Sequence, residues 1–79
     1  MKVGNFIYQT GTDTFGLVIS KQKNGSFKIV KIARNEQGNF SGKAKFDSIS
    51  GWYPEPVVVD GTKIPQIVYR KLLTKSTGD

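Results

Sequence analysis

The chain contains no cysteine and no histidine among its 79 residues. The missing thiols exclude a disulfide framework and a thiolate metal site, and their absence is typical of proteins in a reducing compartment. The missing imidazole removes the side chain that most often acts as a general base or metal ligand near neutral pH. We therefore expect no metal, no cofactor and no catalytic residues, and we expect that the protein is not an enzyme.

Acidic residues and long apolar runs are also scarce. Nearly all of the six acids stand beside Gly, Asn, Ser or Pro, where a carboxylate is usually a solvated turn-former. No apolar run approaches the roughly 18 residues of a membrane span, and no signal-peptide core follows the first residues. The sequence thus predicts a cytoplasmic protein without a membrane segment.

The length and composition predict one small domain. Apolar residues make up 37% and charged residues 23% of the chain, which is normal for a globular fold. We expect the domain to cover residues 1–75 and residues 76–79 to form a frayed tail. A core of this size gains from association, so a weak homo-oligomer is an open alternative.

Alternating apolar and polar residues predict four strands before a proline-bounded connector. Their expected ranges are 3–9, 15–21, 26–33 and 40–46. The alternation places the rings of Phe15, Phe27, Phe40 and Phe46 in the core.

The third strand allows two interpretations. It is either buried on both faces, or it has a bulge near Ile29 that turns Lys28 and Lys31 outward together. The dipeptide Asn24-Gly25 before it predicts a type I′ hairpin turn.

The last third of the chain is less regular. The residues around Asp60-Gly61 predict a compact hairpin between residues 57–59 and 62–64. Residues 65–73 are ambiguous, because apolar positions fall at helical spacing although the residue types favour a strand. We favour a short helix there. Together the elements predict an all-β fold, a small barrel of five to six antiparallel strands with this helix at its C-terminal end.

Two segments carry a resemblance to known barrels. The chain opens with Val3-Gly4-Asn5-Phe6-Ile7, then Gly11, then Phe15-Gly16-Leu17-Val18-Ile19. This opening resembles the first hairpin of SH3-like small barrels, in particular KOW and Tudor-type modules. Later, Gly51-Trp52-Tyr53-Pro54 resembles the approach to the last strands of SH3 folds. The resemblance implies a barrel of about five strands that binds nucleic acid or proteins, and it assigns no site residues.

Positive charge is concentrated in the middle of the chain. Seven of the twelve Lys and Arg residues lie between positions 21 and 45, against the single acid Glu36. If the third and fourth strands pair, we expect four of these side chains to converge on or near one outer surface, namely Lys28, Lys31, Lys43 and Lys45. Lys21, Lys23 and Arg34 should lie at the two ends of that surface, and we expect all seven cations to bind phosphates. The alternative is a solvated face that keeps the protein soluble and protects sheet edges.

Two aromatic residues in the connector complete the expected site. Adjacent side chains in an extended connector should point apart, so at least one of Trp52 and Tyr53 should reach the surface. Tyr53 is the first candidate for stacking on a base. For Trp52 we favour a role as a plug at one end of the barrel over stacking on a base.

These observations favour a non-enzymatic nucleic-acid-binding module of low sequence specificity for DNA or RNA. The alternative is a small protein-interaction module, such as an accessory subunit or a phage-type inhibitor of a host machine, that docks on an acidic protein surface.

Overall fold

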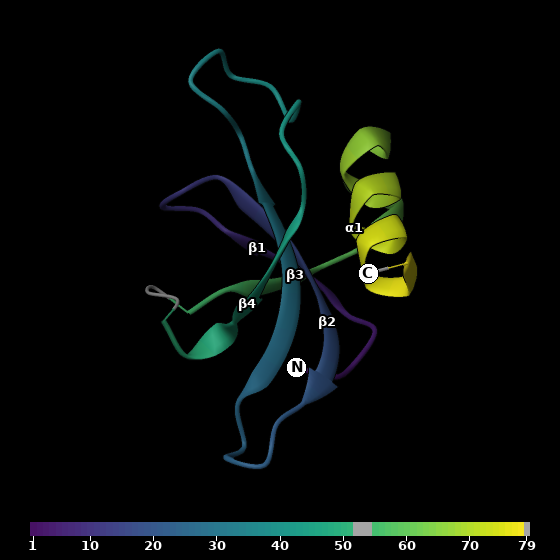
Figure 1. The fold of residues 1–79 in the computed structure, drawn as a ribbon. Helices are drawn as coiled ribbons and strands as arrows, with labels where there is room; N and C mark the ends of the chain where they lie inside the picture. Colours follow the sequence, from purple (N-terminus) through teal and green to yellow (C-terminus); the bar gives the residue numbers. More distant parts are fainter. Residues whose placement is uncertain (52–54, 79) are drawn as a thin grey trace.

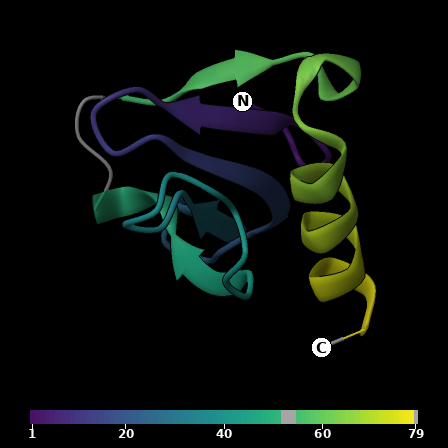
Figure 2. The same cartoon turned by 90° about the horizontal axis from the view of Figure 1, so that it is seen from above.

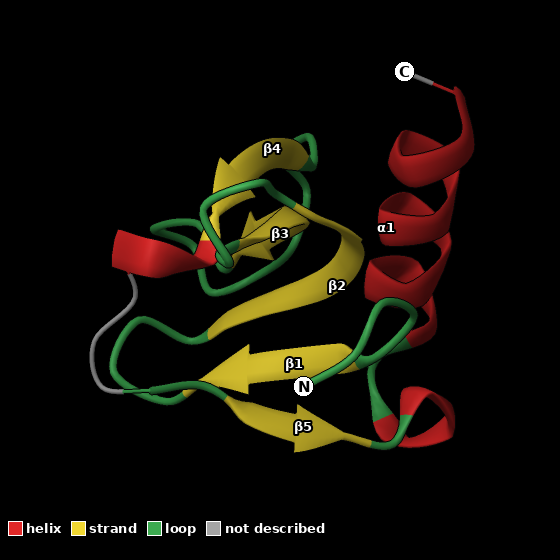
Figure 3. Ribbon diagram, turned by 90° about the horizontal axis from the view of Figure 1, so that it is seen from below, coloured by secondary structure: helices red, strands yellow, loops and turns green. Residues whose placement is uncertain are grey.

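The computed structural model describes residues 1–51 and 55–78. It contains one antiparallel sheet with the strand order β4-β3-β2-β1-β5 and one C-terminal helix, α1 (Figures 1 and 3). The strands are β1 (Phe6–Gln9), β2 (Thr14–Lys21), β3 (Phe27–Ala33), β4 (Lys45–Ser48) and β5 (Val57–Val59). Two short 3-10 turns, η1 (Ile49–Gly51) and η2 (Gly61–Lys63), and the helix α1 (Gln66–Gly78) complete the fold. The predicted five antiparallel strands and short helix are confirmed.

The sheet is open, and the predicted closure into a barrel is wrong. β4 and β5 form its two edges in the described part of the chain (Figure 3). The expected hairpin partner of β5, residues 62–64, does not form a strand. Instead, the Asp60 side chain accepts a 2.9 Å hydrogen bond from the backbone N of Thr62 and caps η2. This cap turns the chain away from the sheet and into α1.

The predicted fourth strand, residues 40–46, begins five residues before the strand in the structure. Residues 40–44 are irregular, and β4 runs over Lys45–Ser48. Phe40 and Ala44 are nevertheless buried in the core, as the alternation predicts. Phe46 differs from the prediction, because 42% of its surface is exposed.

Burial on both faces is the correct interpretation of β3. Ile29 and Val30 are adjacent and both fully buried. The register shift lies in the β2–β3 pair, where Ile19 is the extra residue on β2. The pairing of β3 with β4 is continuous across the same stretch. Lys28 and Lys31 are three residues apart on a regular strand, so their side chains leave opposite faces.

The turn between β2 and β3 is not the predicted type I′. Gly25 has a φ of +87°, but Asn24 keeps a negative φ. The backbone N of Gly25 donates to the carbonyl of Gln22, and the N of Gln22 donates to the carbonyl of Ser26. This is the pattern of a type I turn followed by a left-handed glycine.

Apolar side chains form one cluster on each face of the sheet. On one face, Leu17, Val30 and Ile32 pack with Val68 and Leu72 of α1. This contact holds the helix along one side of the curled sheet (Figure 2). On the other face, Ile7, Val18 and Ile29 form a smaller cluster that Phe27 and Ile49 cover. Among the residues described, no helix has the length and hydrophobicity that a bilayer crossing requires.

The end of α1 includes most of the predicted tail. Residues 76–78 form its last turn, and the hydroxyl of Ser76 donates to the carbonyl of Leu73 at 2.8 Å. Whether this turn frays in solution stays a prediction.

Candidate functional site

The structure distributes the seven predicted cations over several surfaces. Lys21 ends β2 and Lys23 lies in the following turn, at one end of the β2–β3 hairpin, whereas Arg34 follows the other end of β3 (Figure 1). Seven strand residues separate the two ends by about 20 Å. Lys21, Lys23 and Arg34 therefore lie at the two ends of the hairpin, as expected. The expected convergence of Lys28, Lys31, Lys43 and Lys45 on one surface is wrong, because Lys28 and Lys31 leave opposite faces of β3.

Lys31 and Lys45 lie on the face opposite Lys28. They are direct partners in the β3–β4 register, and the Nζ of Lys31 is 2.6 Å from the Oδ2 of Asp47. This ion pair offsets the charge of Lys31. A polyanion on the other face of the sheet would not reach these two lysines.

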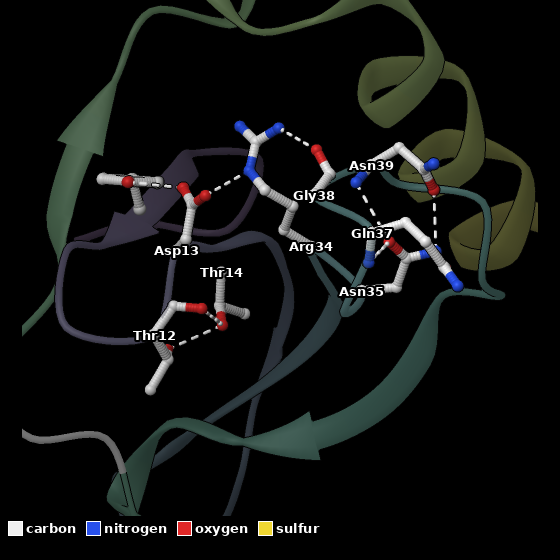
Figure 4. Close-up of polar contacts among 9 residues, drawn as sticks. Thr12, Asp13, Thr14, Arg34, Asn35, Gln37, Gly38 and Asn39 are labelled. Atoms are coloured by element: carbon white, nitrogen blue, oxygen red, sulfur yellow. Dashed lines mark hydrogen bonds and ion pairs between the residues drawn. The ribbon is translucent and has the colours of Figure 1, made fainter.

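The side chain of Arg34 contacts three other residues and so connects separate segments of the chain. Its Nε donates to the carboxylate of Asp13, and its Nη1 donates to the carbonyl of Gly38 at 2.7 Å (Figure 4). Its guanidinium also lies 4.5 Å from the centre of the Phe40 ring. The hydroxyl of Tyr8 also donates to Asp13, at 2.6 Å. The hydrogen bonds from Tyr8 and Arg34 hold the pKa of Asp13 below its usual value, while the contact with Asp13 raises the pKa of Tyr8.

The loop after Arg34 is fixed by one asparagine. The Oδ1 of Asn35 accepts from the backbone N of Gln37 and of Asn39, each at 3.0 Å (Figure 4). This Asx-type turn directs the chain back toward Phe40 and the irregular segment that follows it.

A groove of about 360 Å³ lies between this irregular segment and α1. None of the described residues that line it is acidic, and four of them are cationic. The four cations are Lys43, Arg70, Lys71 and Lys75. A groove lined by charge of one sign focuses its field and attracts anions.

The two walls of the groove are joined by Lys71. Its Nζ donates to the carbonyl of Phe40 at 2.7 Å and to that of Gly42 at 2.8 Å. These bonds tie the irregular segment to the helix and place Lys43 across from α1. Lys71 and Lys75 are four residues apart, so they extend along one flank of the helix.

Phe46 extends the cationic region beyond the groove. The Nζ of Lys28 and the Nζ of Lys75 lie 4.7 Å and 4.9 Å from the centre of its ring. Lys75 thus belongs to both the groove and the ring contact. We call the whole region the basic surface, formed by Lys28, Lys43, Phe46, Arg70, Lys71 and Lys75.

Sequence reasoning included only two residues of the basic surface, Lys28 and Lys43. It placed Phe46 in the core, and it did not include the cations of the last segment among the site residues. The sequence did carry one signal of the basic surface. Lys71 and Lys75 are four residues apart, beside the buried positions of the same helix, which places both lysines on one flank of it. Trp52 and Tyr53 lie outside the described residues.

The groove leads to a prediction about stability. Replacing Lys71 with Met removes two charge-assisted hydrogen bonds and releases the irregular segment. We expect the free energy of unfolding in urea to fall by about 1–3 kcal/mol. Lys2→Met is the matched control, because it removes the same charge at an exposed position. Equal effects of the two substitutions would contradict the role of Lys71.

The Asp13 contact leads to a prediction about pH. A carboxyl whose pKa is lowered by folding stabilises the protein above its usual pKa of 3.8, and this stabilisation is lost as the pH falls below that value. Asp13→Asn should therefore lower the urea midpoint at pH 7 but have a shrinking effect toward pH 2. The effect should be small, since the Arg34 and Asp13 side chains are 41% and 37% exposed. A difference that stays constant from pH 7 to pH 2 would contradict this account.

Comparisons with protein-family models, with curated proteins and with solved structures find no significant match to this chain. In the described ranges, no three His, Cys, Asp or Glu side chains gather as metal ligands. The basic surface is thus the feature from which a function can be argued.

Proposed function

We propose that the protein is a non-enzymatic nucleic-acid-binding module of low sequence specificity, and that the basic surface is its contact region. The observation that supports this most is the groove with four cations and no acid among its described lining residues. A phosphodiester backbone carries regularly spaced negative charge, and cations that neutralise it release counterions into solution. Binding of this kind needs no reactive group.

The ion pairs elsewhere in the molecule also favour the basic surface as the contact region. Lys31 and Arg34 each contact a carboxylate. Lys71 instead donates to two carbonyl oxygens, and no carboxylate of the described residues forms an ion pair with it. Like charges close together repel one another, and a bound polyanion would relieve that repulsion.

The kind of cation supports low specificity. Three of the four groove cations are lysines, which act as point charges toward phosphate, and Arg70 is the one guanidinium in the groove. Reading a base edge usually requires a bidentate group held in place. The resemblance of the first hairpin to KOW and Tudor-type modules is compatible with this proposal, and we keep that SH3-like relationship as part of it.

A protein-interaction module is the second candidate. It is favoured by the edge strand β5, where Val57 and Val58 are each 52% exposed. An exposed strand edge can pair with a strand of an acidic partner protein or of a second copy. This candidate predicts no binding to DNA or RNA at any salt concentration.

Two neighbouring charge reversals test the proposal. Lys43 lies in the groove, whereas Lys45 lies on the opposite face. We expect Lys43→Glu to weaken binding to a fluorescent oligonucleotide by about tenfold at low salt, and Lys45→Glu by less than about threefold. Lys45→Glu should fold well, since it places a carboxylate opposite Lys31.

The salt dependence distinguishes phosphate binding from other contacts. We expect log K to fall with log salt concentration with a slope of about −3 to −5, as for a few phosphate contacts. Equal losses from Lys43→Glu and Lys45→Glu would refute the groove as the contact region, and a flat salt dependence would refute the proposal as a whole.

A further inference from the structure

Phe46 is the one aromatic side chain of the basic surface, and it is only partly covered. It lies on an edge strand, and 42% of its surface is exposed. The groups that approach its ring include two ammonium groups, Lys28 Nζ and Lys75 Nζ. An exposed apolar ring on a cationic surface is a feature that phosphate binding alone does not require.

The ring is held more firmly than the cations around it. Phe46 pairs directly with Val30, which is fully buried and belongs to the larger apolar cluster. The strand ladder therefore fixes the backbone from which the ring extends. Lys28 and Lys75 reach the ring through long flexible side chains, which can move without disturbing the fold.

Such a ring can accept the face of a nucleobase. Base stacking on an exposed aromatic side chain is stronger than a cation–π contact at an exposed site, so a base would displace the two ammonium groups. The displaced ammonium groups would stay close to the phosphates on either side of that base. Lys75 also lines the groove, so the strand would continue from the ring along Lys71 and Lys43.

We propose that Phe46 is a stacking platform for an unpaired base, and that the module prefers single-stranded nucleic acid to duplex. This inference rests on the proposed function, because it assigns the ligand of the same surface. A duplex keeps the faces of its bases in its own stack, whereas a single strand can turn one base outward. The sequence of that base matters little, because every base has an aromatic face.

The experiment compares three probes by fluorescence anisotropy or competition: a labelled single-stranded 12-mer, the same sequence as a duplex, and inorganic polyphosphate, which has charge but no bases. We expect the wild-type protein to bind the single strand about tenfold more tightly than the duplex at equal salt. Phe46→Leu should lose about tenfold for the single strand and change polyphosphate binding by less than about twofold. Phe46→Trp keeps an aromatic ring at this position, so it should bind the single strand about as tightly as the wild-type protein does.

The outcomes separate this inference from the proposed function. Equal affinity of the wild-type protein for single strand and duplex, with no effect of Phe46→Leu, would overturn the stacking platform and leave phosphate binding intact. No binding of any of the three probes by the wild-type protein would overturn both. If Phe46→Leu loses its circular dichroism signal, equal affinity of the wild-type protein for single strand and duplex would by itself overturn the preference for single strands.

Discussion

The packing of α1 against the sheet is the contact on which the rest of the molecule depends. Val68 and Leu72 are fully buried against Leu17, Val30 and Ile32. Burying such a side chain stabilises a fold by about 1.5–3 kcal/mol, which is a large share of the stability of a small domain. The same contact sets the rotation of the helix about its axis. Once Val68 and Leu72 face the sheet, Lys71 and Lys75 must lie on the flank beside residues 41–44, and the groove follows from that placement.

The irregular segment before β4 is shaped by this helix. A continuous strand over residues 40–46 would satisfy its carbonyl groups through a neighbouring strand. In the structure, the carbonyls of Phe40 and Gly42 accept from Lys71 Nζ. Lys71 follows Phe40 by 31 residues and Gly42 by 29 residues in the sequence, and its side chain thus takes the place of strand pairing. The segment can then bend so that Phe40 and Ala44 reach the core while Lys43 remains exposed. One lysine therefore links the apolar core to the cationic groove.

Sequence reasoning predicted the first three strands, the burial of Phe40 and the C-terminal helix, because these depend on local periodicity. The same periodicity placed Phe46 in the core, where the structure does not have it. Sequence reasoning did not predict the open sheet, since alternation shows which face a residue takes and not which strands pair. It also placed the charge incorrectly. Cations close together in sequence were expected to be close in space, but regular alternation sends Lys28 and Lys31 to opposite faces. The cations that meet Lys43 come from the helix, through contacts that no local pattern reveals.

The central claim is that this helix flank and the segment facing it form a surface for nucleic acid. The most direct measurement is an NMR titration of the isotopically labelled protein with a short single-stranded oligonucleotide, following the backbone amide of every residue. The account predicts that the largest shifts fall on residues 41–46 and 70–75 and on Lys28, with little change at Lys21 and Lys23. Shifts centred on the β2–β3 turn or on the opposite face of the sheet, or no shifts at millimolar oligonucleotide, would contradict it.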